Sequence, residues 1–373
     1  MQRKVALAVL TIFLTGICHG MALAQNAGQG QNEKSLKKLE QREVYRKTVE
    51  TKSKTGHQKQ LQVKKIPAEF KDVQSDWSRE EVLEARVKGF VDGYEDLTFR
   101  PNVPVTQMEM LALLLKVQGM EDQVKNCQLS AEQTELLKKI PDWGKNYVAV
   151  ALQQGLLTTE EVSKFNPQEG AKRYEVCRYM ARVLEENGID IPEETQPVFT
   201  DENEIPDGEV QPVRLMWTYR IAMGYPGGKF NPMSVVKRSE MAALLNRLDD
   251  NCLQRFKDST IKGSVKDIEP LTNGGFIITV LNPQGEEVQV TTNQETKMLY
   301  EGHLISTVIN ITDALKIKVL VNEDGEAILV RFMDADSEPA TEPAAVSGEG
   351  EAAVEAANAD AASTQAETSD SSE

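Results

Sequence analysis

Gly224-Tyr225-Pro226-Gly227-Gly228-Lys229-Phe230-Asn231-Pro232 contains the pattern that determines the architecture, because its Phe-Asn-Pro ending belongs to a set of three. The other two members are Phe99-Arg100-Pro101 and Phe165-Asn166-Pro167, and the three phenylalanines are 66 and 65 residues apart. An acidic residue recurs at the same two spacings, as Glu109, Glu175 and Glu240. Landmarks that keep one register indicate an internal repeat whose copies share a core.

Each repeat has the same predicted layout. An apolar-periodic helix such as 80–88 comes first, and a glycine-containing turn follows it. The Phe-x-Pro triplet then breaks the chain before a second, more apolar helix. In the first repeat Thr106 and Glu109 have the spacing of a capping box, which marks the start of that second helix. Trp77 and Trp143 precede the first helix at a fixed repeat position, which favours core anchors over sugar-binding platforms.

The repeats are predicted at 70–120, 121–190 and 191–252, and a different pattern begins after them. Residues 255–333 contain β-rich runs with turn sequences between them, at 261–268, 275–281, 287–292, 315–321 and 327–332. About five strands in so short a segment predict a small antiparallel barrel-like domain, of the kind that binds oligonucleotides or oligosaccharides. A structural or protein-contact role is the main interpretation for this domain.

The two ends of the chain are expected to lie outside the folded part. Residues 1–24 have the layout of a secretory signal, with Arg3 and Lys4 before an apolar run and Ala22-Leu23-Ala24 at the cleavage position. Residues 25–69 form a basic, flexible arm, and 334–373 an acidic tail that is too polar to fold. No later stretch has transmembrane length. An exported protein is therefore predicted, located at the cell wall, the cell surface or the periplasmic face of an outer membrane.

Charge and composition narrow the function. The chain has 373 residues and a formal charge of −16, so it would repel a nucleic-acid backbone. Its three histidines, His19, His57 and His303, show no metal-ligand spacing or nearby nucleophile pattern. No phosphate-binding glycine motif occurs. We therefore expect no enzyme activity, no metal and no cofactor, although a glycosidase with two carboxylates brought together only in space is not excluded by sequence.

The repeats resemble the S-layer homology family. The resemblance is carried by Phe70-Lys71-Asp72-Val73, by 89–102 with its Gly-Phe-Val-Asp-Gly-Tyr start, and by Phe199-Thr200-Asp201 with 224–232. It implies a mainly α, three-repeat module shaped as a three-lobed helical bundle. It also implies binding to cell-wall polysaccharide, often pyruvylated, or to modified peptidoglycan.

The resemblance also implies a binding tetrad of the Thr-Arg-Ala-Glu type at the start of each second helix. An arginine there offers a planar cation beside unsatisfied backbone N–H groups, which suits a carboxylate. The third repeat has Arg238 and Glu240, with Gly224 and Tyr225 in its turn, and the second has Arg173 and Glu175 but Thr159-Glu160 in place of Gly-Tyr. The first repeat has Gly93 and Tyr94, yet its tetrad has Gln107 before Glu109. Which tetrad meets which turn is left open, and each arginine could also be an ordinary exposed charge at a helix start.

The sequence thus predicts a non-catalytic anchoring protein whose partner is a cell-wall glycan or peptidoglycan, with other envelope proteins as possible partners of the β domain. The alternative is a structural surface-layer or outer-membrane-tethering component that acts through protein–protein contacts. An exported carbohydrate-active enzyme is disfavoured, since no catalytic constellation accompanies the repeats.

Overall fold

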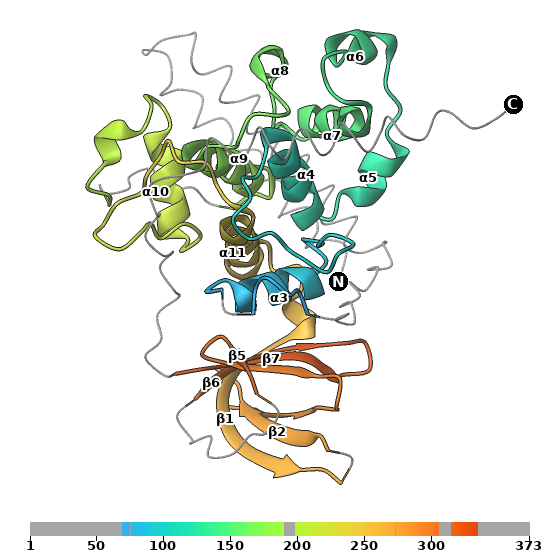
Figure 1. The fold of residues 1–373 in the computed structure, drawn as a ribbon, viewed down its shortest axis with the longest axis vertical. Coiled ribbons are helices and arrows are strands. Elements are labelled where there is room, and N and C mark those ends of the chain that lie inside the picture. The colour runs from blue at the N-terminus through green and yellow to red at the C-terminus, as the bar shows by residue number, and fades with distance from the viewer. Residues whose placement is uncertain (1–68, 75, 190–197, 273, 306–314, 335–373) are drawn as a thin grey trace, which may run out of the picture. The chain divides into compact units, whose positions relative to one another are not determined.

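The computed structural model describes residues 69–74, 76–189, 198–272, 274–305 and 315–334 (Figure 1). The predicted signal at 1–24, nearly all of the basic arm and nearly all of the acidic tail therefore lie outside the described residues. Within those ranges, no helix is both long enough and apolar enough to cross a membrane.

Helices make up the part of the chain assigned to the repeats (Figure 1). The helix that opens each repeat is α3, α7 or α10, and the apolar second helix is α4, α9 or α11. The described helices are α3 (Arg79–Val87), α4 (Gln107–Val117), α5 (Glu121–Asn126), α6 (Ala131–Leu136), α7 (Asp142–Gln153), α8 (Thr159–Lys164), α9 (Arg173–Glu186), α10 (Val210–Thr218) and α11 (Arg238–Leu248), with the short turns η1 (Glu202–Glu204), η2 (Asp249–Leu253) and η3 (Lys257–Ser259).

Helix α4 begins at the residue that the sequence indicates. The Thr106 hydroxyl accepts a hydrogen bond from the Glu109 N–H at 3.2 Å, and Glu109 accepts one from the Thr106 N–H at 2.9 Å. This reciprocal pair satisfies two N–H groups that the helix leaves unbonded. Met108, Leu111 and Leu115 then lie on its buried face, so the helix is held by the core.

Backbone hydrogen bonds join the three repeats in a closed ring. The Val105 N–H donates to the Val236 carbonyl at 2.9 Å, the Val236 N–H to the Ala171 carbonyl at 3.0 Å, and the Ala171 N–H to the Val105 carbonyl at 2.8 Å. Each of these residues lies just before the second helix of its repeat. The ring relates the three segments by approximate threefold symmetry.

A seven-stranded mixed sheet follows the helices. Its strands are β1 (Thr260–Pro270), β2 (Phe276–Leu281), β3 (Glu287–Thr291), β4 (Lys297–Tyr300), β5 (His303–Leu304), β6 (Lys316–Val321) and β7 (Ala327–Met333). They are ordered β3-β2-β1-β6-β7-β4-β5, and β4 pairs parallel to β7. The prediction of an antiparallel barrel was wrong. The sheet is open, with β3 and β5 as edges, because β4 and β5 extend it beyond β7 instead of closing it onto β3.

The two faces of the sheet pack against different partners, as alternation along a strand requires. Ile317, Val319 and Val321 of β6 belong to a core confined to the β domain. Leu320, between them, belongs to the core of the helical repeats, and so does Leu329 of β7. Helix α3 therefore packs against the sheet near β7, and the repeats and the β domain share buried apolar surface (Figure 1).

A buried cluster of charges lies at this junction. Glu84 of α3 is fully buried and contacts Lys88, Lys318 of β6 and Arg331 of β7. Burial by itself raises the pKa of Glu84, but the three surrounding cations outweigh it and hold that pKa well below its usual range. Lys88 also pairs with Asp249 at 3.0 Å and Asp250 at 2.8 Å of η2. The charges thus connect the first repeat, the end of the third repeat and the sheet.

The segment between α11 and β1 is fixed to the first repeat. Arg255 Nη1 donates to the carbonyls of Lys116 and Val117 at 2.9 and 2.7 Å, which are among the last carbonyls of α4. The Phe256 ring packs edge-on against Phe90 with the ring centres 5.7 Å apart. These contacts hold the β domain in place from its N-terminal side.

Candidate functional site

The glutamates of the three tetrads have a structural role at the helix starts. Glu175 accepts from the Lys172 N–H and Glu240 from the Lys237 N–H, each at 2.8 Å, as Glu109 does from Thr106. This bond satisfies an N–H group just before the helix, whichever residue precedes it. The carboxylates are therefore engaged at the helix ends, and a direct role for them in ligand binding stays a prediction.

Arg238 lies against the turn of the first repeat and not against the turn of its own repeat. Its Nε donates to the Phe99 carbonyl and its Nη2 to the Asp92 carbonyl, both at 2.9 Å. Its guanidinium lies over the rings of Tyr94 and Phe99, 5.2 and 4.5 Å from their centres. The sequence places Arg238, Gly224 and Tyr225 in one repeat, but the structure brings Arg238 to Gly93 and Tyr94.

Arg173 of the second repeat likewise lies against the turn of another repeat, in this case the third. Its guanidinium lies 4.8 Å from the ring centre of Tyr225 and 4.9 Å from that of Phe230, both in the third repeat. The Tyr225 hydroxyl donates to Glu240 at 2.8 Å. Arg173 is 0% exposed and Tyr225 5%, whereas Tyr94 is 37% exposed and Arg238 half-buried. Of these two arginine–tyrosine pairs, the one with Arg238 is exposed to solvent.

Gln107 faces the second repeat. Its Oε1 accepts from the Asn166 N–H at 3.3 Å, and its Nε2 lies 3.4 Å from a carboxylate oxygen of Glu175. Helix α8 occupies the place where the other two repeats have their Gly-Tyr turn. This position therefore has neither the arginine nor the tyrosine of the other two pairs.

Both Gly-Tyr turns require glycine, because an aromatic ring packs directly against the Cα of Gly93 and against that of Gly224. A Cβ at Gly93 would lie 1.9 Å from Phe70 Cε1, and one at Gly224 would lie 2.6 Å from Phe199 Cε1. Gly224 also has φ of 79°, which a side chain would strain. The glycines thus allow the rings of Phe70 and Phe199 to pack directly beneath the two turns.

Asp72 and Asp201, which the sequence shows in the Phe-x-Asp motifs without indicating a role for them, hold the Phe-x-Pro segments of the first and third repeats. The carboxylate of Asp72 accepts from the N–H groups of Phe99 and Arg100 at 2.8 and 2.7 Å. Asp201 does the same for Phe230 and Asn231, at 2.8 Å each. The Phe-x-Asp motifs at 70–72 and 199–201 carry this signal, because the same motif precedes both Gly-Tyr turns, by 27 and 29 residues from the aspartate to the phenylalanine that it binds.

The two tryptophans predicted as core anchors are exposed, and that interpretation was wrong. Trp77 is 37% and Trp143 54% exposed. Trp77 precedes α3 and Trp143 lies in the first turn of α7, where both rings are directed away from the core. Small apolar residues such as Val82 and Val148 fill the core at these helices instead.

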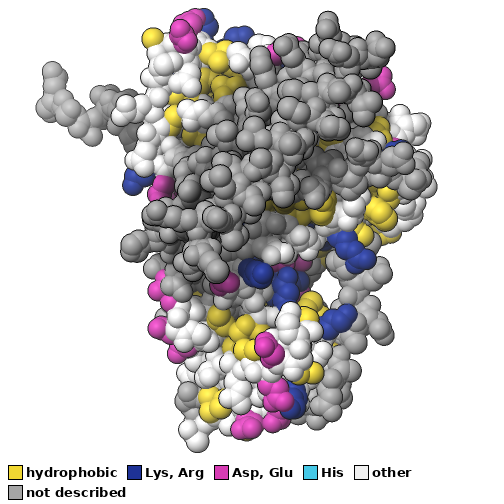
Figure 2. Space-filling view, turned by 180° about the vertical axis from the view of Figure 1, so that it is seen from behind, with side chains coloured by type: hydrophobic (Ala, Val, Ile, Leu, Met, Phe, Trp, Pro, Cys, Tyr) yellow, Lys and Arg dark blue, Asp and Glu magenta, His cyan; other side chains and the backbone are white. Residues whose placement is uncertain are grey.

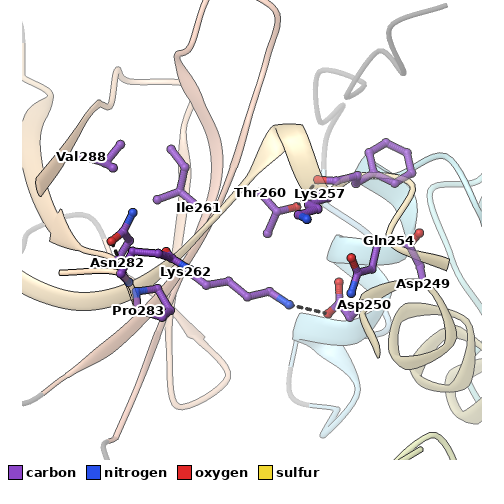
Figure 3. Close-up of a pocket in the computed structure, with 12 residues that line it drawn as sticks. Asp249, Asp250, Gln254, Lys257, Thr260, Ile261, Lys262, Asn282, Pro283 and Val288 are labelled. Atoms are coloured by element: carbon purple, nitrogen blue, oxygen red, sulfur yellow. Dashed lines mark hydrogen bonds and ion pairs between the residues drawn. The ribbon is translucent and has the colours of Figure 1, made fainter. Parts of the chain in front are cut away.

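A separate pocket of about 360 Å³ lies between the end of the third repeat and the β domain. Figure 3 shows Lys262 reaching from β1 toward Asp250, with Asn282 and Pro283 of the β2–β3 turn on the other side. The Lys262 ammonium lies 3.9 Å from the Asp250 carboxylate, and burial lowers the pKa of Lys262. The described residues contain no group of three His, Cys, Asp or Glu side chains that could hold a metal ion.

A family model for the S-layer homology domain matches residues 69–111 and 198–242. The chain thus carries S-layer homology domains, the domain type by which proteins are held at the cell surface. The matches fall on the first and third repeats, which are the two that keep the Gly-Tyr turn. Membership of the second repeat in the family stays a prediction.

Curated relatives that match this chain include two polysaccharide-degrading enzymes by name and a cell surface glycoprotein, all much longer than the matched region. The amylopullulanase of Thermoanaerobacterium thermosulfurigenes is 32% identical over 32% of this chain and 6% of its own length. The exoglucanase XynX of Acetivibrio thermocellus is 30% identical over 32% of this chain and 11% of its own length. Cell surface glycoprotein 1 of Acetivibrio thermocellus is 24% identical over 43% of this chain and 7% of its own length. The chain therefore spans a small part of these relatives, and the likeness lies in the S-layer homology region.

Proposed function

We propose that this protein attaches to the cell envelope by binding an anionic cell-wall polymer in the groove formed by Arg238 of the third repeat and Gly93-Tyr94 of the first. The observation that carries the proposal is the fixed position of Arg238. Two backbone carbonyls hold one side of its guanidinium, at 2.9 Å each. A guanidinium has five N–H donors, so the others can bind a carboxylate without any rearrangement.

The charge of Arg238 is also important for attracting an anionic polymer. On the face shown in Figure 2, acidic and basic side chains both occur over the described surface in small groups. With a net charge of −16 the chain as a whole repels an anion, so attraction must come from local cations. The half-buried setting of Arg238 strengthens that local interaction relative to an exposed lysine.

The other two positions are assigned lesser roles. Arg173 and Tyr225 form a buried counterpart that supports the third repeat, with Glu175 and Glu240 at the adjoining helix starts. Gln107 replaces the cation at the remaining position, beside Glu109. We infer a non-catalytic anchoring role with one main wall-binding groove and a β domain that presents the module or contacts another envelope protein.

Co-sedimentation with purified wall material tests the proposal. The mature protein should sediment with native wall and should lose most binding after the acidic substituents of the wall are removed. Arg238→Ala should weaken binding strongly, whereas Gln107→Ala should leave it close to wild type. Equal binding, or equal failure, on native and stripped wall would refute the proposal. Failure on both together with capture of an envelope protein would favour the surface-layer or tethering role instead.

A further inference from the structure

Arg100 occupies a backbone position that arginine rarely adopts. Its φ is 58°, in the left-handed region. Asn231, at the equivalent place in the third repeat, has φ of 54°, and asparagine is among the residues that tolerate this conformation. An arginine that persists in a costly conformation indicates a role for its side chain.

The side chain of Arg100 extends back over the groove. Its guanidinium carbon lies 3.9 Å from the ring centre of Tyr94, the ring on which Arg238 also rests at 5.2 Å. Two guanidinium carbons at those distances from one point lie within about 9 Å of each other. One ring thus brings together two cations from repeats far apart in the sequence.

We propose that Arg100 is the second ligand-binding cation of this groove and that both arginines grip one acidic sugar residue of the polymer, with Tyr94 as their support. This inference rests on the proposed function. A guanidinium stacked on a ring keeps its N–H donors at its edge, where an in-plane carboxylate can meet them. Tyr94 is then a positioning residue and not a surface on which the sugar stacks.

Nearby carboxylates make the second cation necessary. Asp96 lies 3.4 Å from Arg100, but it is bound more closely by its own turn, to the Thr98 hydroxyl at 2.6 Å and the Thr98 N–H at 3.0 Å. Those hydrogen bonds from Thr98 lower the pKa of Asp96, which keeps it charged. Asp92 is paired with Lys116 at 2.8 Å. Without Arg100, the charge of Asp96 would repel an incoming carboxylate.

The test compares charge-matched variants on wall polysaccharide, native and carboxyl-reduced. Arg100→Asn installs the residue found in the other two repeats, so the turn should remain folded. It should weaken binding to the native polymer about five- to tenfold and make that binding less sensitive to salt. Lys138→Asn, which removes an exposed lysine 63% accessible in the second repeat, is the control and should change neither. Affinity for the reduced polymer should be low and the same for all.

Two further variants separate the possible results. Tyr94→Phe keeps the ring and should bind like wild type, whereas Tyr94→Leu should resemble loss of an arginine. If Arg238→Ala loses binding while Arg100→Asn keeps both wild-type affinity and salt dependence, the role of Arg100 is refuted and the proposed function stands. If neither substitution affects binding, the proposed function fails as well.

Discussion

The most informative stability prediction concerns Glu84→Gln in the buried charge cluster. Glu84 is fully buried and is the one carboxylate of the cluster that contacts Lys88, Lys318 and Arg331. Removing one partner of a buried ion pair costs about 3–5 kcal/mol, because it leaves uncompensated charge in the interior. Asp249 and Asp250 still neutralise Lys88, and Asp250 also Lys318, so we expect the lower end of that range.

The assay is thermal and urea unfolding of the full chain. A loss of about 3 kcal/mol lowers the melting temperature by about 6–12 °C in a protein of this size. Glu160→Gln is the matched control, because Glu160 pairs with Lys164 at 3.0 Å while both side chains are about four-fifths exposed. Exposed pairs contribute less than about 1 kcal/mol. A melting temperature for Glu84→Gln within 1 °C of that control would refute the view that this cluster holds the β domain to the repeats.

Three further predictions follow from the same structure. The fold lowers the pKa values of Glu84 and Asp250, so the stability that these carboxylates contribute is present above their ordinary pKa values of 4.5 and 3.8 and is lost as the pH falls. The urea midpoint of the wild-type protein should therefore drop between pH 5 and 3, and that of Glu84→Gln should drop less steeply. Identical slopes for the two proteins would contradict this. Gly224→Ala should destabilise by about 1–3 kcal/mol more than Gly227→Ala, since both have positive φ but only Gly224 has neighbours in the way; equal urea midpoints would disprove the clash. Burial raises the pKa of the Cys252 thiol to about 11. At pH 8 this thiol should therefore react with iodoacetamide far more slowly in the folded protein than in the urea-unfolded chain. Equal rates in the two states would contradict the burial of Cys252.

Local signals in the sequence predicted the local structure well. Thr106 and Glu109 marked the start of α4, and the β-rich runs 261–268 and 327–332 correspond to β1 and β7. The capping spacing and strand alternation are short-range features, so a single sequence is enough to read them. Strand β4 was missed because its four residues, Lys297–Tyr300, are stabilised by parallel pairing with β7 far along the chain.

The site could be predicted only in its parts. The sequence predicts Arg238 and Tyr94 as binding residues, and their role stays a prediction; their pairing depends on how the repeats close into a ring, which is a tertiary property. The sequence shows Arg100 only as the middle residue of a Phe-x-Pro triplet, because neither its left-handed backbone nor its contact with Tyr94 can be read from motif spacing. The prediction that Trp143 is a core anchor was wrong for a similar reason, since a position in the repeat does not determine whether a side chain faces the core or the solvent.

In the proposed function, Arg238 of the third repeat and Tyr94 of the first jointly form one wall-binding site. A double-mutant cycle on wall affinity, with Arg238→Ala and Tyr94→Leu, tests it most directly. Residues that act on one ligand as a unit show coupling of about 0.5–3 kcal/mol, so the double variant should bind little worse than either single one. Arg238→Ala combined with Tyr225→Phe, the pairing within one repeat, should be additive. Additive losses for Arg238 and Tyr94, or strong coupling between Arg238 and Tyr225, would contradict the account.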